Sequence, residues 1–95
     1  MKTCCIIGLG YIGLPTAAVL ANTGSRVIGV DVNNEIVETV NHGHIHILEP
    51  GLEQAVADAV SSGALKAQLS PTHADVFLIA VPTPLSSSKD GLPQP

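Results

Sequence analysis

The feature that most constrains this chain is a glycine pattern near its start. Residues 4–15 read CCIIGLGYIGLP, in which Gly8, Gly10 and Gly13 follow an apolar run. Glycines at this spacing permit a tight turn from a strand into a helix. The pattern alone is weak evidence for a ligand, because a turn that binds nothing can contain the same glycines. The flanking residues therefore decide what the pattern means.

Strand and helix patterns alternate after the start of the chain. Residues 3–9 are apolar without strict alternation, which is typical of a strand buried on both faces. Residues 11–23 have apolar side chains at helical spacing and several alanines, which predict a helix. A second strand is predicted at 26–30, and a second helix, capped by Asn33, is predicted to run to about Asn41.

The second half of the chain continues the alternation. It predicts a helix at 52–63, a weak strand at 65–70 and an apolar strand at 76–81 whose outer edge is unpaired. Residues 82–95 contain four prolines and three consecutive serines, so we expect a loop there. The order predicts an α/β fold, the N-terminal part of a Rossmann-type doubly wound parallel sheet with about four strands in the order 3-2-1-4, spanning 1–95.

Composition excludes several classes of partner. The formal net charge is −4 and only four residues are Lys or Arg, so we expect no nucleic-acid partner. The chain shows no apolar run of membrane-spanning length and no secretory signal, so we expect no membrane partner. Cys4 and Cys5 are the only cysteines, and neighbouring cysteines rarely pair, which favours a reduced, cytoplasmic protein.

The context of the glycine pattern favours a dinucleotide site over an empty turn. Gly8 would permit the tight turn, Gly10 would let a pyrophosphate approach the backbone, and Gly13 would let the helix pack close to the strand. The amides at the helix start, at Tyr11 and Ile12, would point at the phosphates, and the helix dipole would favour their negative charge.

Asp31 supplies the second half of the fingerprint, because it ends the second predicted strand. A carboxylate there can accept hydrogen bonds from both ribose hydroxyls of an adenosine, and it would repel a 2′-phosphate. No Arg or Lys follows between Asp31 and Asn41 to accommodate that phosphate. The sequence therefore predicts NAD rather than NADP. The alternative is a solvated carboxylate or a helix cap, although Asn33 is the better cap.

A further contact is predicted after the last strand. The strand order puts the carboxyl end of 76–81 beside the glycine turn, and ligands of such sheets bind in the crevice between these two strand ends. The segment Val81-Pro82-Thr83-Pro84 leaves this end. Thr83 offers a hydroxyl and an amide beside the cofactor. The alternative is a rigid loop exit with no contact.

A histidine cluster and a cysteine pair carry no predicted function. His42, His44 and His46 are spaced by two, but the predicted helix end breaks their alignment, so we predict no metal site. Cys4 and Cys5 lie in a buried strand without an evident base, so neither is predicted to be a nucleophile.

Four stretches together resemble a known family. GLGYIGLPTAA, VIGVDVN, IHILEPGL and ADVFLIAVPTP are similar to the N-terminal part of the UDP-glucose/GDP-mannose dehydrogenase family, and the resemblance covers nearly all of 4–84. Within the family, IGLPTAA and the IHI-x-EP stretch are most similar to bacterial members that act on UDP-N-acetyl-D-mannosamine.

The resemblance implies an activity. Such enzymes oxidise the C6 alcohol of a sugar nucleotide to a carboxylate in two NAD-dependent steps, here UDP-N-acetyl-D-mannosamine to its uronate, for cell-surface polysaccharide. It implies cofactor contacts at Tyr11, Ile12, Asp31 and Thr83 besides the glycines. The family's catalytic residues lie downstream, so none is expected within 1–95, which alone would be inactive. The UDP-sugar substrate and homo-oligomer formation would belong to the full-length protein.

Three alternatives stay open at this point. The chain could belong to a UDP-glucose 6-dehydrogenase or another member of the same family. It could open a 3-hydroxyacid or 3-hydroxyacyl-CoA dehydrogenase, although the EPGL and PTP segments argue against that class. It could also be an NAD-binding module without enzymatic activity.

Overall fold

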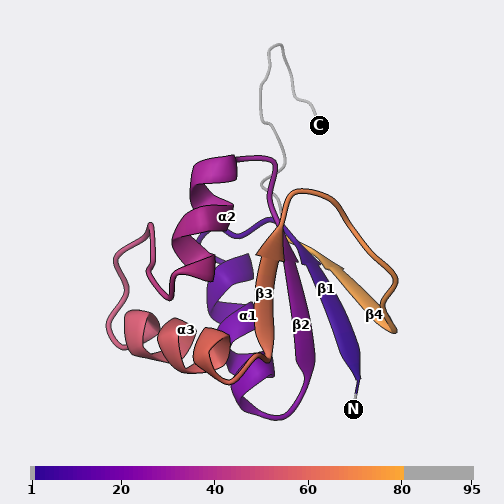
Figure 1. Cartoon of the computed structure of the whole chain (residues 1–95), viewed down its shortest axis with the longest axis horizontal. Helices are drawn as coiled ribbons and strands as arrows, with labels where there is room; N and C mark the ends of the chain where they lie inside the picture. The colour runs from indigo at the N-terminus through magenta and orange to yellow at the C-terminus, as the bar shows by residue number, and fades with distance from the viewer. Residues whose placement is uncertain (1, 81–95) are drawn as a thin grey trace, which may run out of the picture.

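The computed structural model describes residues 2–80, which form a parallel sheet with helices (Figure 1). Four strands are hydrogen-bonded in the order β3-β2-β1-β4, and every neighbouring pair is parallel. This confirms the predicted Rossmann-type parallel sheet and its strand order 3-2-1-4. The predicted loop at 82–95 lies outside the described residues. The elements in chain order are β1 (Thr3–Ile7), α1 (Gly13–Asn22), β2 (Arg26–Val30), α2 (Asn34–Asn41), α3 (Leu52–Ser61), β3 (Leu65–Gln68) and β4 (Val76–Ile79).

The element bounds differ from the predictions mainly at the first turn. β1 ends at Ile7 rather than at residue 9, and α1 begins at Gly13 rather than at residue 11. Gly8 has a φ of 102°, which takes the chain out of the strand at once. We call the intervening residues 8–12 the glycine loop. α3 and β3 end at Ser61 and Gln68, earlier than predicted.

The three helices cover one face of the sheet (Figure 1). Alternate strand residues such as Cys4, Ile6 and Val27 point to this face and join side chains of all three helices in one core. Within residues 2–80, no helix has the length and apolar character needed to cross a membrane. The buried cluster comprises Cys4, Ile6, Leu9, Leu14, Ala17, Ala18, Ala21, Val27, Val37, Val40, Ile47, Leu52, Val56, Ala59, Leu65 and Ala67.

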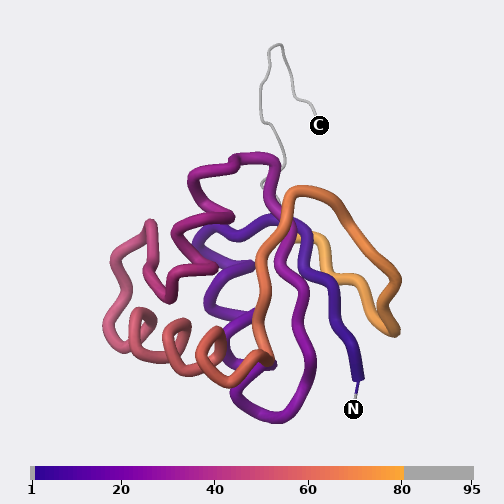
Figure 2. Tube along the Cα trace, viewed as in Figure 1, coloured from indigo at the N-terminus to yellow at the C-terminus, as the bar shows by residue number. Residues whose placement is uncertain are grey.

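β4 is the least covered strand. The chain from β3 to β4 crosses as a loop on the side of the sheet opposite the helices (Figure 2). Among the described residues β4 pairs only with β1, so its outer edge is open, as the sequence predicts. Phe77 and Ile79 are 52% and 75% exposed. The most apolar predicted strand therefore lies at an edge.

The opposite edge of the sheet is closed by a side chain. The Asn41 side-chain amide donates to the carbonyl oxygen of Ala67 at 2.8 Å, and the Ala67 amide donates back to Asn41 Oδ1 at 2.8 Å. These two Ala67 groups face away from β2. The carbonyl oxygens on the β2 side, those of Ala64 and Gln68, accept hydrogen bonds from the amides of Val27 and Asp31. Asn41, at the end of α2, thus satisfies the edge strand as a further strand would.

Asn41→Ala is expected to destabilise the protein by about 1–2 kcal/mol, because two good hydrogen bonds are lost and the Ala67 backbone groups are left unpaired. Chemical denaturation measures the change. The matched control is Asn34→Ala in the same helix, whose side chain makes an exposed 3.4 Å contact with Glu38, and whose expected cost is within about 0.5 kcal/mol. Equal effects of the two substitutions would contradict the assigned role of Asn41.

Candidate cofactor-binding site

The glycine loop is held against the carboxyl end of β2. The Gly8 amide donates to the carbonyl oxygen of Val30 at 2.7 Å, which extends the pairing of β1 with β2 by one bond. The φ of 102° at Gly8 then turns the chain away from the sheet. This position of Gly8 matches the tight turn that the sequence predicts for it.

The other two glycines of the pattern differ in their surroundings. A Cβ atom built on Gly13 would overlap the carbonyl oxygen of Gly8 and lie 2.8 Å from its carbonyl carbon. The start of α1 therefore packs directly on the loop backbone. A Cβ atom built on Gly10 meets no atom within 4 Å. The space in front of Gly10 is open, as the approach of a pyrophosphate requires.

The N-terminus of α1 offers unpaired amides. The Leu14 amide is bonded to Gly10 within the first turn, but within residues 2–80 no hydrogen bond uses the amides of Gly10, Tyr11, Ile12 or Gly13. α1 also has no side-chain cap and no acidic residue in its first turn. Free amides and an uncompensated helix dipole make this end suited to a phosphate.

α2 provides the contrast within the same chain. The Asn33 side chain accepts hydrogen bonds from Glu35 and Ile36 at 2.9 and 3.4 Å, so the predicted cap is confirmed. Glu35 also places a negative charge in the first turn of α2. An anion would find the start of α2 already satisfied, unlike the start of α1.

Asp31 lies directly beside the glycine loop. It follows β2, and its Oδ2 accepts a hydrogen bond from the Leu9 amide at 3.0 Å. Its Oδ1 accepts from the Asn33 amide at 3.0 Å. The structure thus brings together the glycines and the acid that are far apart in the sequence. A carboxylate oxygen accepts more than one hydrogen bond, so both oxygens retain acceptor sites for a ligand.

A cleft of about 570 Å³ opens beside the loop. It lies between the start of α1 and the carboxyl end of β4, where ligands of doubly wound sheets bind. Tyr11, Ile12 and Ile79 are 73%, 71% and 75% exposed there. A larger depression of about 770 Å³ lies at residues 43–57, away from the strand ends. The residues that carry the unpaired amides, Gly10 to Gly13, line the first cleft and not the second. The lining residues are Ile6, Gly10, Tyr11, Ile12, Gly13, Thr16, Leu78, Ile79 and Ala80.

Thr83 and the three histidines are the other residues that the sequence analysis considers. Thr83 lies outside the described residues. His42 Nδ1 is 2.7 Å from the carbonyl oxygen of Glu38, and His44 Nδ1 is 3.5 Å from Glu53 Oε2, so both rings interact locally. Within residues 2–80, no three His, Cys, Asp or Glu side chains come together as a metal site.

Two residues of the site were missed by the sequence interpretation. Leu9 was read as the end of the first strand, but its side chain is buried in the core while its amide reaches Asp31. Gly29 was read as one more residue of a buried strand, but it leaves the space that the Leu9 side chain fills. A glycine inside an apolar strand is the only sequence signal for such a close approach.

Comparison with protein families agrees with this geometry. Residues 2–92 match the model of the UDP-glucose/GDP-mannose dehydrogenase family, NAD binding domain. The chain is 59% identical over 80 residues to the UDP-N-acetyl-D-mannosamine dehydrogenase of Campylobacter jejuni, covering 84% of this chain and 20% of that protein. It is 56% identical over 88 residues to the NDP-N-acetyl-D-galactosaminuronic acid dehydrogenase of Ralstonia nicotianae, covering 93% and 21%.

Solved structures give the same relationship. The UDP-N-acetyl-mannosamine dehydrogenase Cap5O of Staphylococcus aureus superposes with a TM-score of 0.87 at 44% identity, over 92% of this chain and 21% of that one. The GDP-mannose dehydrogenase of Pseudomonas aeruginosa superposes with a TM-score of 0.85 at 36% identity, over 90% and 20%. The chain therefore spans about a fifth of the length of these relatives.

The glycine loop, the open start of α1 and Asp31 occur in the order and topology of a nucleotide-binding half-sheet, and the family comparison covers nearly the whole chain. The chain belongs to the UDP-glucose/GDP-mannose dehydrogenase family, and its residues 2–92 match the NAD-binding domain of that family.

Proposed function

We propose that this chain binds NAD for a sugar-nucleotide 6-dehydrogenase whose substrate is UDP-N-acetyl-D-mannosamine and whose product is the corresponding uronate. The single observation that supports the cofactor site best is at the start of α1: the amides of Gly10–Gly13 have no partner within residues 2–80, and the helix has no side-chain cap there. The substrate is supported by relatives of that name, such as the one from Campylobacter jejuni.

Each predicted site residue has a separate task in this proposal. The amides of Tyr11 and Ile12 would donate hydrogen bonds to the pyrophosphate, and the open space at Gly10 would let it approach the backbone. Gly8 and Gly13 shape the turn that makes this approach possible, and Asp31 accepts hydrogen bonds from the ribose hydroxyls of the adenosine. These residues bind and orient the cofactor.

The cleft between the start of α1 and the end of β4 would hold the other half of the dinucleotide. The exposed side chains of Tyr11, Ile12 and Ile79 line this cleft. Thr83, which follows β4 in the sequence and has a hydroxyl and an amide, is the proposed further contact. NAD held there would supply the hydride acceptor for the two oxidation steps that convert an alcohol to a carboxylate.

The activity itself belongs to the full-length protein in this proposal. Residues 1–95 supply no catalytic group, and the UDP-sugar site and homo-oligomer contacts lie in the remainder of the protein. A cytoplasmic location is part of the proposal, supported by Cys4 and Cys5, both free and buried.

The test of the reaction uses the protein at its full natural length. With UDP-N-acetyl-D-mannosamine in limiting amount, we expect about two NADH per substrate molecule and a uronate product, because two hydride transfers convert an alcohol to a carboxylate. NADH absorbance and mass spectrometry of the sugar nucleotide measure both. Turnover of UDP-glucose in preference to the mannosamine nucleotide would contradict the substrate assignment and leave the NAD assignment intact.

A different N-acetylhexosamine nucleotide is the second candidate substrate. The Ralstonia relative, which is 56% identical over 93% of this chain, is named for NDP-N-acetyl-D-galactosaminuronic acid. The same assay distinguishes the two, because the galactosamine nucleotide would then be turned over faster than the mannosamine nucleotide.

Asp31→Asn is expected to weaken NAD binding by about 2 kcal/mol, since hydrogen bonds to a charged acceptor are replaced by weaker ones, which is about 30-fold in Kd. It should also reduce the preference for NAD over NADP, because the charge that repels a 2′-phosphate is removed. Calorimetric titration of both cofactors measures the two effects. Asp58→Asn, an exposed carboxylate on α3, is the matched control. A variant that keeps the full preference for NAD would exclude Asp31 as the discriminating group.

A further inference from the structure

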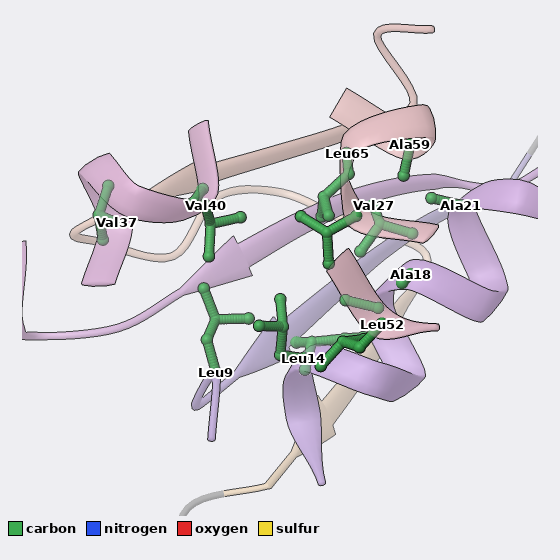
Figure 3. Packing of buried hydrophobic residues seen from close by; sticks show 14 of the residues in the cluster. Leu9, Leu14, Ala18, Ala21, Val27, Val37, Val40, Leu52, Ala59 and Leu65 are labelled. Atoms are coloured by element: carbon green, nitrogen blue, oxygen red, sulfur yellow. The ribbon is translucent and has the colours of Figure 1, made fainter. Parts of the chain in front are cut away.

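One residue of the glycine loop is fixed in the core while its neighbours face the solvent. The Leu9 side chain is 0% exposed and belongs to the buried cluster. Figure 3 shows it pointing into the core on the side where Leu14 and Val40 lie. Tyr11 and Ile12, in contrast, are among the most exposed apolar residues of the chain. The Leu9 side chain therefore attaches the loop to the core.

Gly29 provides the space into which Leu9 fits. A Cβ atom built on Gly29 would lie 2.8 Å from Leu9 Cδ2 and 3.1 Å from Leu9 Cδ1. Gly29 lies in the middle of the sheet, paired with Ile6 on one side and Ala67 on the other. A glycine in a strand interior normally weakens the strand, so its presence indicates a close approach. Here the approaching group is Leu9.

Asp31 holds the backbone of the same residue. Its Oδ2 accepts the hydrogen bond from the Leu9 amide, and its Oδ1 accepts one from Asn33, both at 3.0 Å. The preceding amide, that of Gly8, is bonded to Val30 at 2.7 Å. The chain on the approach to Gly10 is thus fixed by the buried Leu9 side chain and by hydrogen bonds from two consecutive amides, one to a backbone carbonyl and one to the Asp31 carboxylate.

We propose that Leu9, Gly29 and Asp31 form an anchor that holds the glycine loop in its phosphate-binding shape before the cofactor arrives. A loop that is already ordered loses less conformational entropy on binding, so its affinity is higher. Leu9 and Gly29 then position the loop without touching the cofactor, because the Leu9 side chain is buried in the core and Gly29 has no side chain. Asp31 has this task in addition to its ribose contact. The inference rests on the proposed function, since the loop is taken to bind the pyrophosphate of NAD.

The test removes the anchor without changing any group that faces the cofactor. Leu9→Ala deletes the buried side chain and keeps the backbone amide. Leu65→Ala is the matched control, because Leu65 is 2% exposed and lies in β3, at the far edge of the sheet from β4. Gly29→Ala is a second variant in case Leu9→Ala does not fold. Its methyl group displaces the Leu9 side chain while apolar volume is added rather than removed.

Two measurements are made on the protein at its full natural length. The first is hydrogen exchange of the Gly8 and Leu9 amides without any cofactor, and the second is the Kd for NAD by calorimetry. In Leu9→Ala and Gly29→Ala we expect these amides to exchange about tenfold faster than in Leu65→Ala. We expect the Kd for NAD to rise about tenfold, which corresponds to the ordering of about one backbone residue, and Leu65→Ala to stay within about twofold of the unchanged protein.

The proposal is overturned if the two amides exchange equally in Leu9→Ala and Leu65→Ala. It is also overturned if a folded Leu9→Ala or Gly29→Ala protein binds NAD as tightly as the unchanged protein. Failure of the proposed function looks different, because then the unchanged protein does not bind NAD. In that case the exchange measurement, which contains no cofactor, still decides whether the anchor orders the loop.

Discussion

Gly13→Ala is expected to destabilise the protein by about 3 kcal/mol or more, at the upper end of the cost of overpacking. The added methyl group would overlap the backbone carbonyl of Gly8, and it would lie 3.3 Å from Ala80 Cβ. A backbone carbonyl cannot move aside as a side chain end can, so α1 must shift away from the loop. Thermal and chemical denaturation measure the loss.

The outcome that would contradict this prediction is a Gly13→Ala protein with unchanged stability. It would mean that α1 can move outward from β1 at little cost, and that Gly13 is not needed for close packing of helix and strand. A protein that is strongly destabilised but still binds NAD would separate the packing role of Gly13 from cofactor affinity.

Gly10→Ala is expected to have the opposite profile, with little loss of stability and a large loss of NAD affinity. The new methyl group meets no protein atom within 4 Å, so stability should change by no more than about 0.5 kcal/mol. In the proposed binding mode the methyl group would occupy the space through which the pyrophosphate approaches the backbone, so we expect the Kd for NAD to rise about 100-fold. Calorimetric titration and denaturation are carried out on the same sample.

The two glycine variants serve as controls for each other, because each adds one methyl group and Gly10 and Gly13 are close together in the sequence. The assignment of the phosphate to this loop would be wrong if Gly10→Ala binds NAD normally. A Gly10→Ala protein that loses both stability and binding would instead show that the space in front of Gly10 is needed by the protein itself.

The topology could be predicted because it depends on local patterns. The bounds of β2 and the Asn33 cap of α2 match the predictions, since a buried strand and a capped helix start each have their own sequence signal. The juxtaposition of the glycine pattern and Asp31 followed from the rule that parallel strands end at the same edge of a sheet.

The missed contacts depend on residues that only the fold brings together. Leu9 and Gly29 form one contact across two strands, and either residue alone looks like ordinary strand sequence. Asn41 closes the edge of β3 through a contact between residues far apart in the chain. Apolar character also did not reveal that Ile79 is exposed, because it indicates that burial is favourable and not which partner supplies it.

The difference between the two sheet edges gives the sheet a direction of growth. The β3 end is terminated by the Asn41 side-chain amide, so a further strand would have to displace it. At the other end, no strand within residues 2–80 pairs with the outer backbone groups of β4, and the side chains of Phe77 and Ile79 are exposed. A further strand would therefore pair with β4 rather than with β3. That strand could come from the same polypeptide during synthesis or from a neighbouring molecule in an aggregate.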